Sequence, residues 1–257
     1  MKRNLIAALF FLVSLTAVSC SKFSNGEPVT EQRGVDKSFD IICMYNNVNV
    51  NLIHSQHPRL ELTCPKNLID NIVTEVRNDS LIIRNENNFN WLRSYDYTID
   101  LNVYYDSLRE INYASIGRLT TQEPLCGRFT VDSMESVGRH AFMLRTKEGS
   151  GDIDLSFNCD VLRNRFFNGT SQITLRGIVG YSEHIVRSYG TVHAEEMDSN
   201  IVTVAHESTN DLYLKVRDGG SLRAQLNSIG NLYYKGNPNP SLTFIECNGD
   251  GRVIKLE

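Results

Sequence analysis

Apolar and polar residues alternate in the second half of the chain, and the alternation returns at a nearly constant interval. Five alternating segments begin at residues 151, 171, 190, 210 and 230, so successive starts differ by 20, 19, 20 and 20 residues. Such alternation is typical of a strand with one buried face, and the fixed interval is typical of a repeat architecture. The segments are GDIDLSF (151–157), SQITLRG (171–177), GTVHAEE (190–196), NDLYLKV (210–216) and GNLYYKG (230–236).

The apolar residues of these segments fall into two columns when the segments are aligned. The first column is Ile153, Ile173, Val192, Leu212 and Leu232, and the second is Leu155, Leu175, Ala194, Leu214 and Tyr234. Because the same face is apolar at every step, we predict parallel strands stacked as rungs. The predicted fold class is all-β, a right-handed parallel β-solenoid or β-helix with rungs of about 20 residues.

Further strands and corners complete each predicted rung. Second strands are expected at 161–167, 183–189, 200–206 and 221–227. Turn residues such as Gly190 and Gly230 are expected at the corners because they tolerate unusual φ values. One outward column is expected to place Arg176, Glu195 and Lys215 about 4.8 Å apart on successive rungs, as a ladder of opposite charges.

The segment before the repeat is also strand-like, but less regular. Alternating residues occur between 39 and 105, and two apolar runs flank Arg77-Asn78-Asp79, which predicts a hairpin. No long amphipathic helix is apparent. We therefore expect one folded region at 35–257, with irregular strands and a hairpin at 35–113 and solenoid rungs at 114–257.

The first residues have the features of an export signal. A positive start and an apolar run precede Cys20, which predicts a signal peptide at 1–19 that is too short to span a bilayer as a mature helix. Ala17-Val18-Ser19-Cys20 resembles a bacterial lipobox. We expect acyl chains on Cys20 to anchor the protein in a membrane, with 20–34 as a flexible tether. An ordinary secreted protein is the alternative.

The order of strand and corner motifs extends over roughly residues 35–245. It runs through FDII, NVNVNLIH and RLELTCPKNLIDNIVTEVRNDSLIIRN, then YTIDLNVYYDSLREINYASIG, and ends at SIGNLYYKGNP. This order resembles the head GIN domain family of auto-transporter adhesins. Members often have a Ser-Gly-Ser-Gly corner where this chain has Ala114-Ser115-Ile116-Gly117. The resemblance implies an all-β repeat fold in the bacterial envelope, and it brings no catalytic residues.

Charge and cysteine content restrict the partners. Without residues 1–19, the chain has 24 Lys and Arg against 30 Asp and Glu, a net charge of −6. An acidic chain lacks the basic surface that binds nucleic acid, so no nucleic-acid partner is expected. Five cysteines remain after Cys20 and none forms a CxxC, so neither a disulfide framework nor a zinc site is expected. A bridge between Cys43 and Cys64 remains an alternative.

No catalytic, metal or cofactor site is expected. His54 and His57 are three residues apart, and residues at this spacing face opposite sides of a strand. Enzymes that cleave polysaccharides need paired carboxylates. Asp152 and Asp154 share one strand face, but the next rung has no acid at the matching positions. We therefore predict that the protein is not an enzyme.

Exposed aromatic residues are the candidate ligand-binding residues. Tyr213 and Tyr233 fall in adjacent outward positions, and Trp91 lies in a polar stretch. They suit a sugar ring or a partner protein. The alternatives are a stabilising tyrosine ladder and a Trp91 that covers the open end of the core.

The leading hypothesis is a lipid-anchored protein of the cell envelope, placed in the outer membrane on either its periplasmic or its surface face. It would act as an adhesin or binding module for a glycan or an envelope protein. A carbohydrate-active enzyme and a structural or sensing component of the envelope remain as alternatives.

Overall fold

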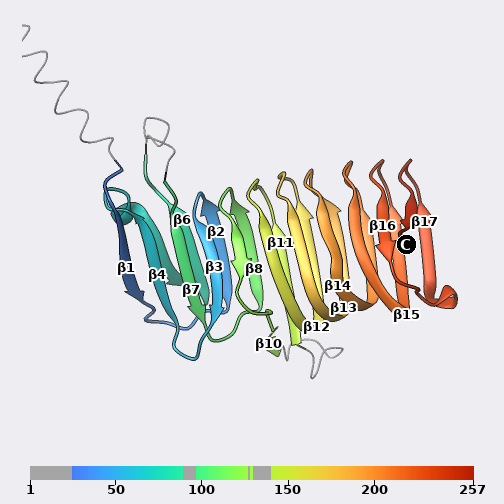
Figure 1. The fold of residues 1–257 in the computed structure, drawn as a ribbon, viewed down its shortest axis with the longest axis horizontal. Coiled ribbons are helices and arrows are strands. Elements are labelled where there is room, and N and C mark those ends of the chain that lie inside the picture. Colours follow the sequence, from blue (N-terminus) through green and yellow to red (C-terminus); the bar gives the residue numbers. More distant parts are fainter. Residues whose placement is uncertain (1–24, 89–96, 127, 130–139) are drawn as a thin grey trace, which may run out of the picture.

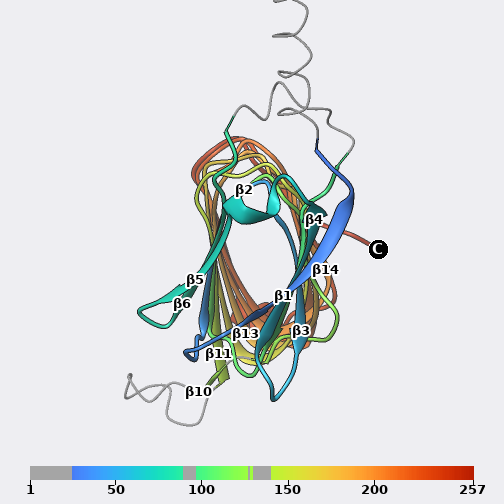
Figure 2. The ribbon, with the colours of Figure 1, turned by 90° about the vertical axis from the view of Figure 1, so that its left-hand side faces the viewer.

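The protein is a long stack of strands, described for residues 25–88, 97–126, 128–129 and 140–257 by a computed structural model. The described strands form one curled, mixed sheet of 18 strands. Figure 1 shows the stack running from β1 (Pro28–Gly34) to β17 (Thr243–Cys247). Figure 2 looks along the stack and shows two walls that join at both edges around a narrow interior. The prediction of an all-β protein is confirmed.

We call the two walls A and B. Wall A contains parallel strands, closed at one end by an antiparallel hairpin of β5 and β6. In stacking order it holds β5 (Ile72–Arg77), β6 (Ser80–Asn85), β2 (Ile41–Asn46), β8 (Glu110–Ser115), β11 (His140–Thr146), the second halves of β12 to β15, and β17. A short strand, β10 (Arg128–Phe129), pairs antiparallel with β11.

Wall B lies opposite. In stacking order it holds β1, β4 (Arg59–Pro65), β7 (Asp100–Tyr105), β3 (Asn49–His54), β9 (Leu119–Thr121), the first halves of β12 to β15, β16 (Leu232–Lys235) and β18 (Val253–Lys255). The strand β4 is antiparallel to both β1 and β7, and the later pairings are parallel. The expected parallel stack therefore holds for the rungs, whereas antiparallel strands build the N-terminal end.

Four long strands run through both walls and make the regular rungs. They are β12 (Ile153–Phe167), β13 (Ile173–Arg187), β14 (Val192–His206) and β15 (Leu212–Leu226). Each continues into the second strand predicted for its rung, so one rung supplies one strand to each wall.

The predicted inward columns are confirmed. The first column pairs residue by residue from Ile153 to Leu232, and every member is at most 1% exposed. The second column is buried as far as Leu214, and its last member, Tyr234, is half-buried.

The N-terminal end of the stack is closed. The predicted hairpin is confirmed, and its turn residues Asn78 and Asp79 have φ values of 47° and 60°, as a two-residue hairpin turn requires. A short 3-10 helix, η1 (Ile69–Asn71), precedes the hairpin. Leu68 and Ile72 on either side of it are 0% and 2% exposed. Apolar side chains from these segments thus cover the core at this end.

Gly190 and Gly230 occupy corners for a different reason from the predicted one. Neither has a φ in the left-handed region. An added Cβ on Gly190 would lie 1.8 Å from the carbonyl oxygen of Ser171, and one on Gly230 would lie 2.3 Å from that of Asn210. Close approach of the preceding rung therefore excludes a side chain at these corners.

The proposed Cys43–Cys64 bridge is absent. Cys43 is half-buried on β2 of wall A, whereas Cys64 is buried on β4 of wall B. The cysteines in the described part of the chain, at positions 43, 64, 126, 159 and 247, are free thiols. The two cysteines lie on opposite walls, and their spacing in the sequence did not indicate this. Among the described residues, no helix has both the length and the hydropathy to cross a bilayer.

Candidate functional site

A continuous row of side chains crosses the outer face of wall B. Ten half-buried residues, one from each of ten successive strands, are linked by the register of the strand pairs. We call this row the outer ladder. In order it contains Glu61, Asn102, Asn51, Thr120, Asp154, Thr174, His193, Tyr213, Tyr233 and Ile254. At about 4.8 Å per strand, the row is about 43 Å long.

The first half of the outer ladder is a hydrogen-bonded row of amides and a hydroxyl. The Asn51 side-chain amide donates to the Asn102 side-chain oxygen at 3.1 Å, and the Thr120 hydroxyl donates to the Asn51 oxygen at 3.2 Å. The Asn102 amide donates to the Glu61 carboxylate at 3.3 Å. Each amide carries two N–H donors and two acceptor lone pairs. The row therefore keeps donors and acceptors free for a ligand.

A groove of about 560 Å³ runs beside this polar half. Asn49 donates to the Asp100 carboxylate at 2.8 Å, and the Arg118 guanidinium lies 3.7 Å from the Asp152 carboxylate. The groove is lined mainly by polar residues, among them Asn49, Asn51, Asp100, Asn102, Arg118 and Thr120. Amides, carboxylates and one guanidinium form a surface that can both donate hydrogen bonds to a ligand and accept them from it.

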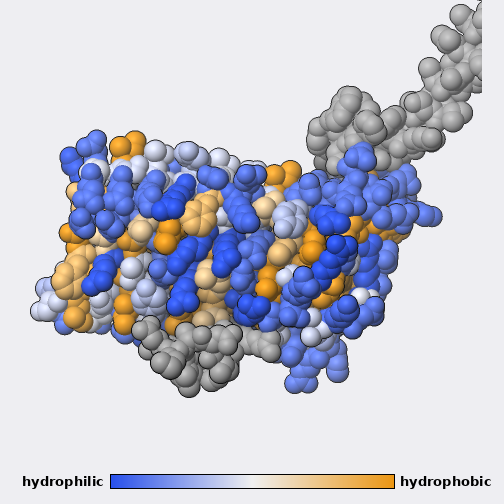
Figure 3. Space-filling model, turned by 180° about the vertical axis from the view of Figure 1, so that it is seen from behind, coloured by the Kyte–Doolittle hydropathy of each residue, from blue (hydrophilic) through white to orange (hydrophobic). Residues whose placement is uncertain are grey.

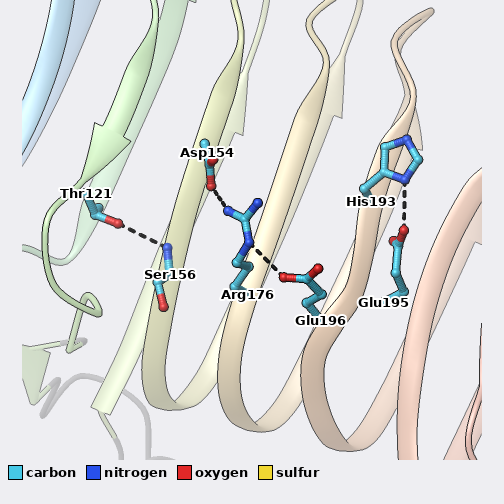
Figure 4. Close-up of polar contacts among 7 residues, drawn as sticks. All are labelled: Thr121, Asp154, Ser156, Arg176, His193, Glu195 and Glu196. Carbon is cyan, nitrogen blue, oxygen red and sulfur yellow. Dashed lines mark hydrogen bonds and ion pairs between the residues drawn. The ribbon is translucent and has the colours of Figure 1, made fainter.

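A charged cluster lies in the middle of wall B (Figure 4). Arg176 donates to Asp154 on one side, and its Nε donates to the Glu196 carboxylate at 2.9 Å on the other. The Glu195 carboxylate instead lies 3.1 Å from Nδ1 of His193 and accepts a hydrogen bond from this nitrogen when it carries a hydrogen. These contacts tie together three successive rungs.

The predicted charge column of Arg176, Glu195 and Lys215 is therefore wrong. The register shifts between Thr174 and Arg176, so that Arg176 lies beside Glu196. Lys215 pairs with Asp198, with 3.6 Å between its ammonium nitrogen and the carboxylate. Irregularities in β14 displace the charges by one residue or more, which the repeat length does not reveal.

The second half of the outer ladder is a stack of rings. His193 and Tyr213 have ring centroids 4.8 Å apart and planes inclined by 9°. Tyr213 and Tyr233 are 4.9 Å apart and inclined by 10°. The structure thus brings the two predicted tyrosines together, with their faces turned toward one another and their edges toward solvent. Burial raises the pKa of the Tyr213 phenol, so its hydroxyl stays protonated and able to donate near neutral pH.

Two other predicted site residues, Trp91 and Cys20, lie outside the described residues. Three residues of the outer ladder were not predicted as site residues: Asn51, Asn102 and Thr120. Their alternation with buried neighbours indicated an outward direction, but nothing local showed that segments 51 residues apart pair side by side.

The family described as "Putative auto-transporter adhesin, head GIN domain" matches residues 38–238. The chain belongs to the head GIN domain family. Its name associates this head GIN domain with adhesion, and therefore with the cell envelope or surface. No curated protein matches its sequence.

Solved structures share the fold of this head GIN domain. A "putative adhesin" from Bacteroides fragilis has a TM-score of 0.76 at 16% identity, covering 91% of this chain and 99% of that one. A "putative lipid binding protein" from Parabacteroides distasonis has a TM-score of 0.66 at 18% identity, covering 91% and 98%. A "putative adhesin" from Parabacteroides merdae has a TM-score of 0.61 at 16% identity, with the same coverage. At these identities the likeness shows the fold alone, and none of the three is named as an enzyme.

Proposed function

We propose that this head GIN domain is a non-catalytic module of the bacterial envelope that binds an extended, neutral glycan along the outer ladder. The observation that carries the proposal is the single row in which hydrogen-bonding amides lead into stacked rings, beside a groove of about 560 Å³. Amide and hydroxyl groups match the paired donors and acceptors of sugar hydroxyls. The tyrosine hydroxyls add further donors and acceptors, because Tyr213 already uses both ring faces in stacking.

The length and charge of the row define the class of ligand. A row of about 43 Å exceeds a single sugar and suits a polymer. The acids Glu61 and Asp154 lie in the row, and the chain as a whole carries a net charge of −4, so a polyanionic glycan would be repelled. A lipid chain is less well suited, because apolar side chains from both walls fill the interior.

In this proposal, acyl chains on Cys20 hold the protein at the outer membrane. The tether expected at 20–34 is shorter than predicted, because Pro28–Gly34 is the strand β1, which pairs with β4. We also propose that the rungs wind as a right-handed β-solenoid. The stack then projects from its N-terminal end, where β1 lies (Figure 1). Wall B stays accessible along the projecting stack. Without protease, the wild type should stay with the membranes and Cys20→Ala should not; equal membrane retention of the two contradicts the anchor. Protease treatment of intact cells then tests the face: cleavage of the wild type indicates the surface face, and protection until lysis indicates the periplasmic face.

Binding to immobilised neutral polysaccharides (a β-glucan, a mannan and a xylan) tests the ligand class. The double variant Asn51→Ala with Asn102→Ala removes both amides from the outer ladder. Thr203→Ala, on the outer face of wall A, is the matched control. Loss of two ligand hydrogen bonds should weaken binding of the retained polysaccharide about tenfold or more.

Two outcomes would contradict the glycan proposal. One is wild-type affinity in the double variant. The other is a wild-type protein that retains none of the three polysaccharides, in which case an envelope protein becomes the leading partner.

A further inference from the structure

The two ends of the stack differ in how the core is covered. At the N-terminal end, η1 and the hairpin cover the core, and the inward residues Leu81 and Ile83 are fully buried. At the other end, β17 and β18 pair with one neighbouring strand each, β15 and β16. Among the strands that the structure describes, both therefore present a free hydrogen-bonding edge, which is a template for pairing with another strand.

The core itself is exposed at this second end. On β15 the inward residues Leu222, Ala224 and Leu226 are at most 2% exposed. Ile245, which pairs with Ala224 and faces the same interior, is 46% exposed. Leu242 beside it is 45% exposed. Phe244 faces outward instead, with the Arg223 guanidinium over its ring. Figure 3 shows some hydrophobic side chains at this end, at the left of the view, among hydrophilic ones.

We propose that this end binds the same end of a second copy of the chain, forming a two-fold symmetric dimer. A two-fold axis parallel to the strands places β17 of each copy beside β18 of the other. Because wall A and wall B run in opposite directions, the new pairs are antiparallel. The arrangement is closed and self-complementary, as a dimer of identical surfaces requires.

Charges at this end favour a second copy as the occupant. Glu246 lies near the end of β17, and Arg252 immediately precedes β18, so both flank the same corner. Within the described part of the chain, neither takes part in an ion pair. In the two-fold arrangement, Glu246 of each copy approaches Arg252 of the other, which gives two reciprocal pairs between neighbouring strands.

The area of the end predicts a reversible dimer. A five-residue strand is about 17 Å long and the walls are about 10 Å apart, so each copy would bury several hundred Å². That is below the roughly 800 Å² per partner of a standard interface. The dimer also places the two N-terminal ends at opposite ends of a double-length stack. Combined with the anchoring proposed above, this geometry joins two facing surfaces.

Sedimentation velocity of the detergent-solubilised full chain, over a range of concentrations, tests the dimer. We expect a monomer–dimer equilibrium for the wild type. Glu246→Arg and Arg252→Glu should each weaken dimerisation about tenfold, because each places like charges together, and the double variant should restore it. A wild type that stays monomeric at every concentration overturns the proposal. So does a dimer that none of the three variants affects. Sedimentation of the wild type and of the variants does not depend on glycan binding, so the dimer can fail while the glycan proposal holds.

Cysteine cross-linking tests the predicted neighbours. Val253→Cys would place a thiol beside the native, exposed Cys247 of the other copy. With copper(II)–phenanthroline as oxidant, two thiols form one disulfide and lose two protons, and two copper(II) ions accept one electron each. We expect a dimer band on a non-reducing gel. Ile178→Cys, exposed in the middle of the stack, is the control. Equal dimer bands from both variants would overturn the end-to-end geometry.

Discussion

Tyr213 and Tyr233 stack almost in parallel, with ring centroids 4.9 Å apart. This separation equals the spacing of the strands that carry them. Strand pairing therefore sets the ring stacking, and Tyr213, the middle of the three rings, uses both faces in contacts with its neighbours. The arrangement strengthens the stack and leaves ring edges and hydroxyls for a ligand.

Removing the middle ring should weaken the stack. Tyr213 contacts both His193 and Tyr233, so Tyr213→Ala should lower the free energy of unfolding by about 1–2 kcal/mol. Tyr213→Phe should stay within about 0.5 kcal/mol of the wild type, because stacking does not need the hydroxyl. Urea denaturation measures both. Equal losses in the two variants would show that the hydroxyl, and not the ring, is stabilising.

Neighbouring residues of β15 should respond in opposite ways to substitution. Leu214 is 2% exposed in the core, so Leu214→Asp should cost several kcal/mol and unfold the domain. Lys215 forms a partly exposed pair with Asp198, and Lys215→Ala should change stability by less than about 0.5 kcal/mol. Circular dichroism with thermal denaturation distinguishes the two. Similar behaviour would mean that the inward and outward faces are assigned wrongly.

Corner glycines should not tolerate a methyl group. Gly190→Ala would force a Cβ to within 1.8 Å of the Ser171 carbonyl oxygen, so we expect a loss of more than about 2 kcal/mol. Gly34→Ala is the matched control, because nothing lies within 4 Å of its added Cβ. It should change stability by less than about 0.5 kcal/mol. Denaturant midpoints of the two variants measure these losses. A small loss of stability in Gly190→Ala would mean that the rungs can separate at the corner.

Stability should fall on acidification because of a buried histidine. His184 is fully buried, one ring nitrogen lies 3.2 Å from the Asn164 amide, and burial lowers its pKa from 6.5 to about 4. Between these values the unfolded chain takes up a proton that the folded chain does not. The free energy of unfolding should therefore fall as pH drops from about 6.5 to about 4, by up to about 3 kcal/mol from this residue.

Denaturant unfolding at about pH 7.5 and about pH 4.5 measures this effect. His184→Leu should show a smaller loss between the two pH values than the wild type, and the exposed His57→Ala should show the same loss as the wild type. An identical pH dependence in His184→Leu and wild type would contradict a role for His184. Burial also lowers the pKa of His206, so part of the loss should remain in His184→Leu.

The repeat was readable from the sequence because each strand of a rung alternates with period two and each rung has nearly constant length. The inward columns from Ile153 to Leu232 and the hairpin at Asn78-Asp79 follow from these local rules. The charge partners of Arg176 do not, because a one-residue irregularity in a neighbouring strand changes which carboxylate is adjacent. The requirement for glycine at position 190 also comes from a different rung, because the Ser171 carbonyl oxygen excludes a Cβ there.

The sequence by itself determined the strand faces, the rung length and the family, since these depend on periodicity and on the order of motifs along the chain. Only the tertiary structure decided that Asn51, Asn102 and Thr120 continue the row that ends in Tyr213 and Tyr233. Pairing between strands 51 and 69 residues apart in sequence sets that row. Such pairing depends on the packing of the whole stack, which no local pattern encodes.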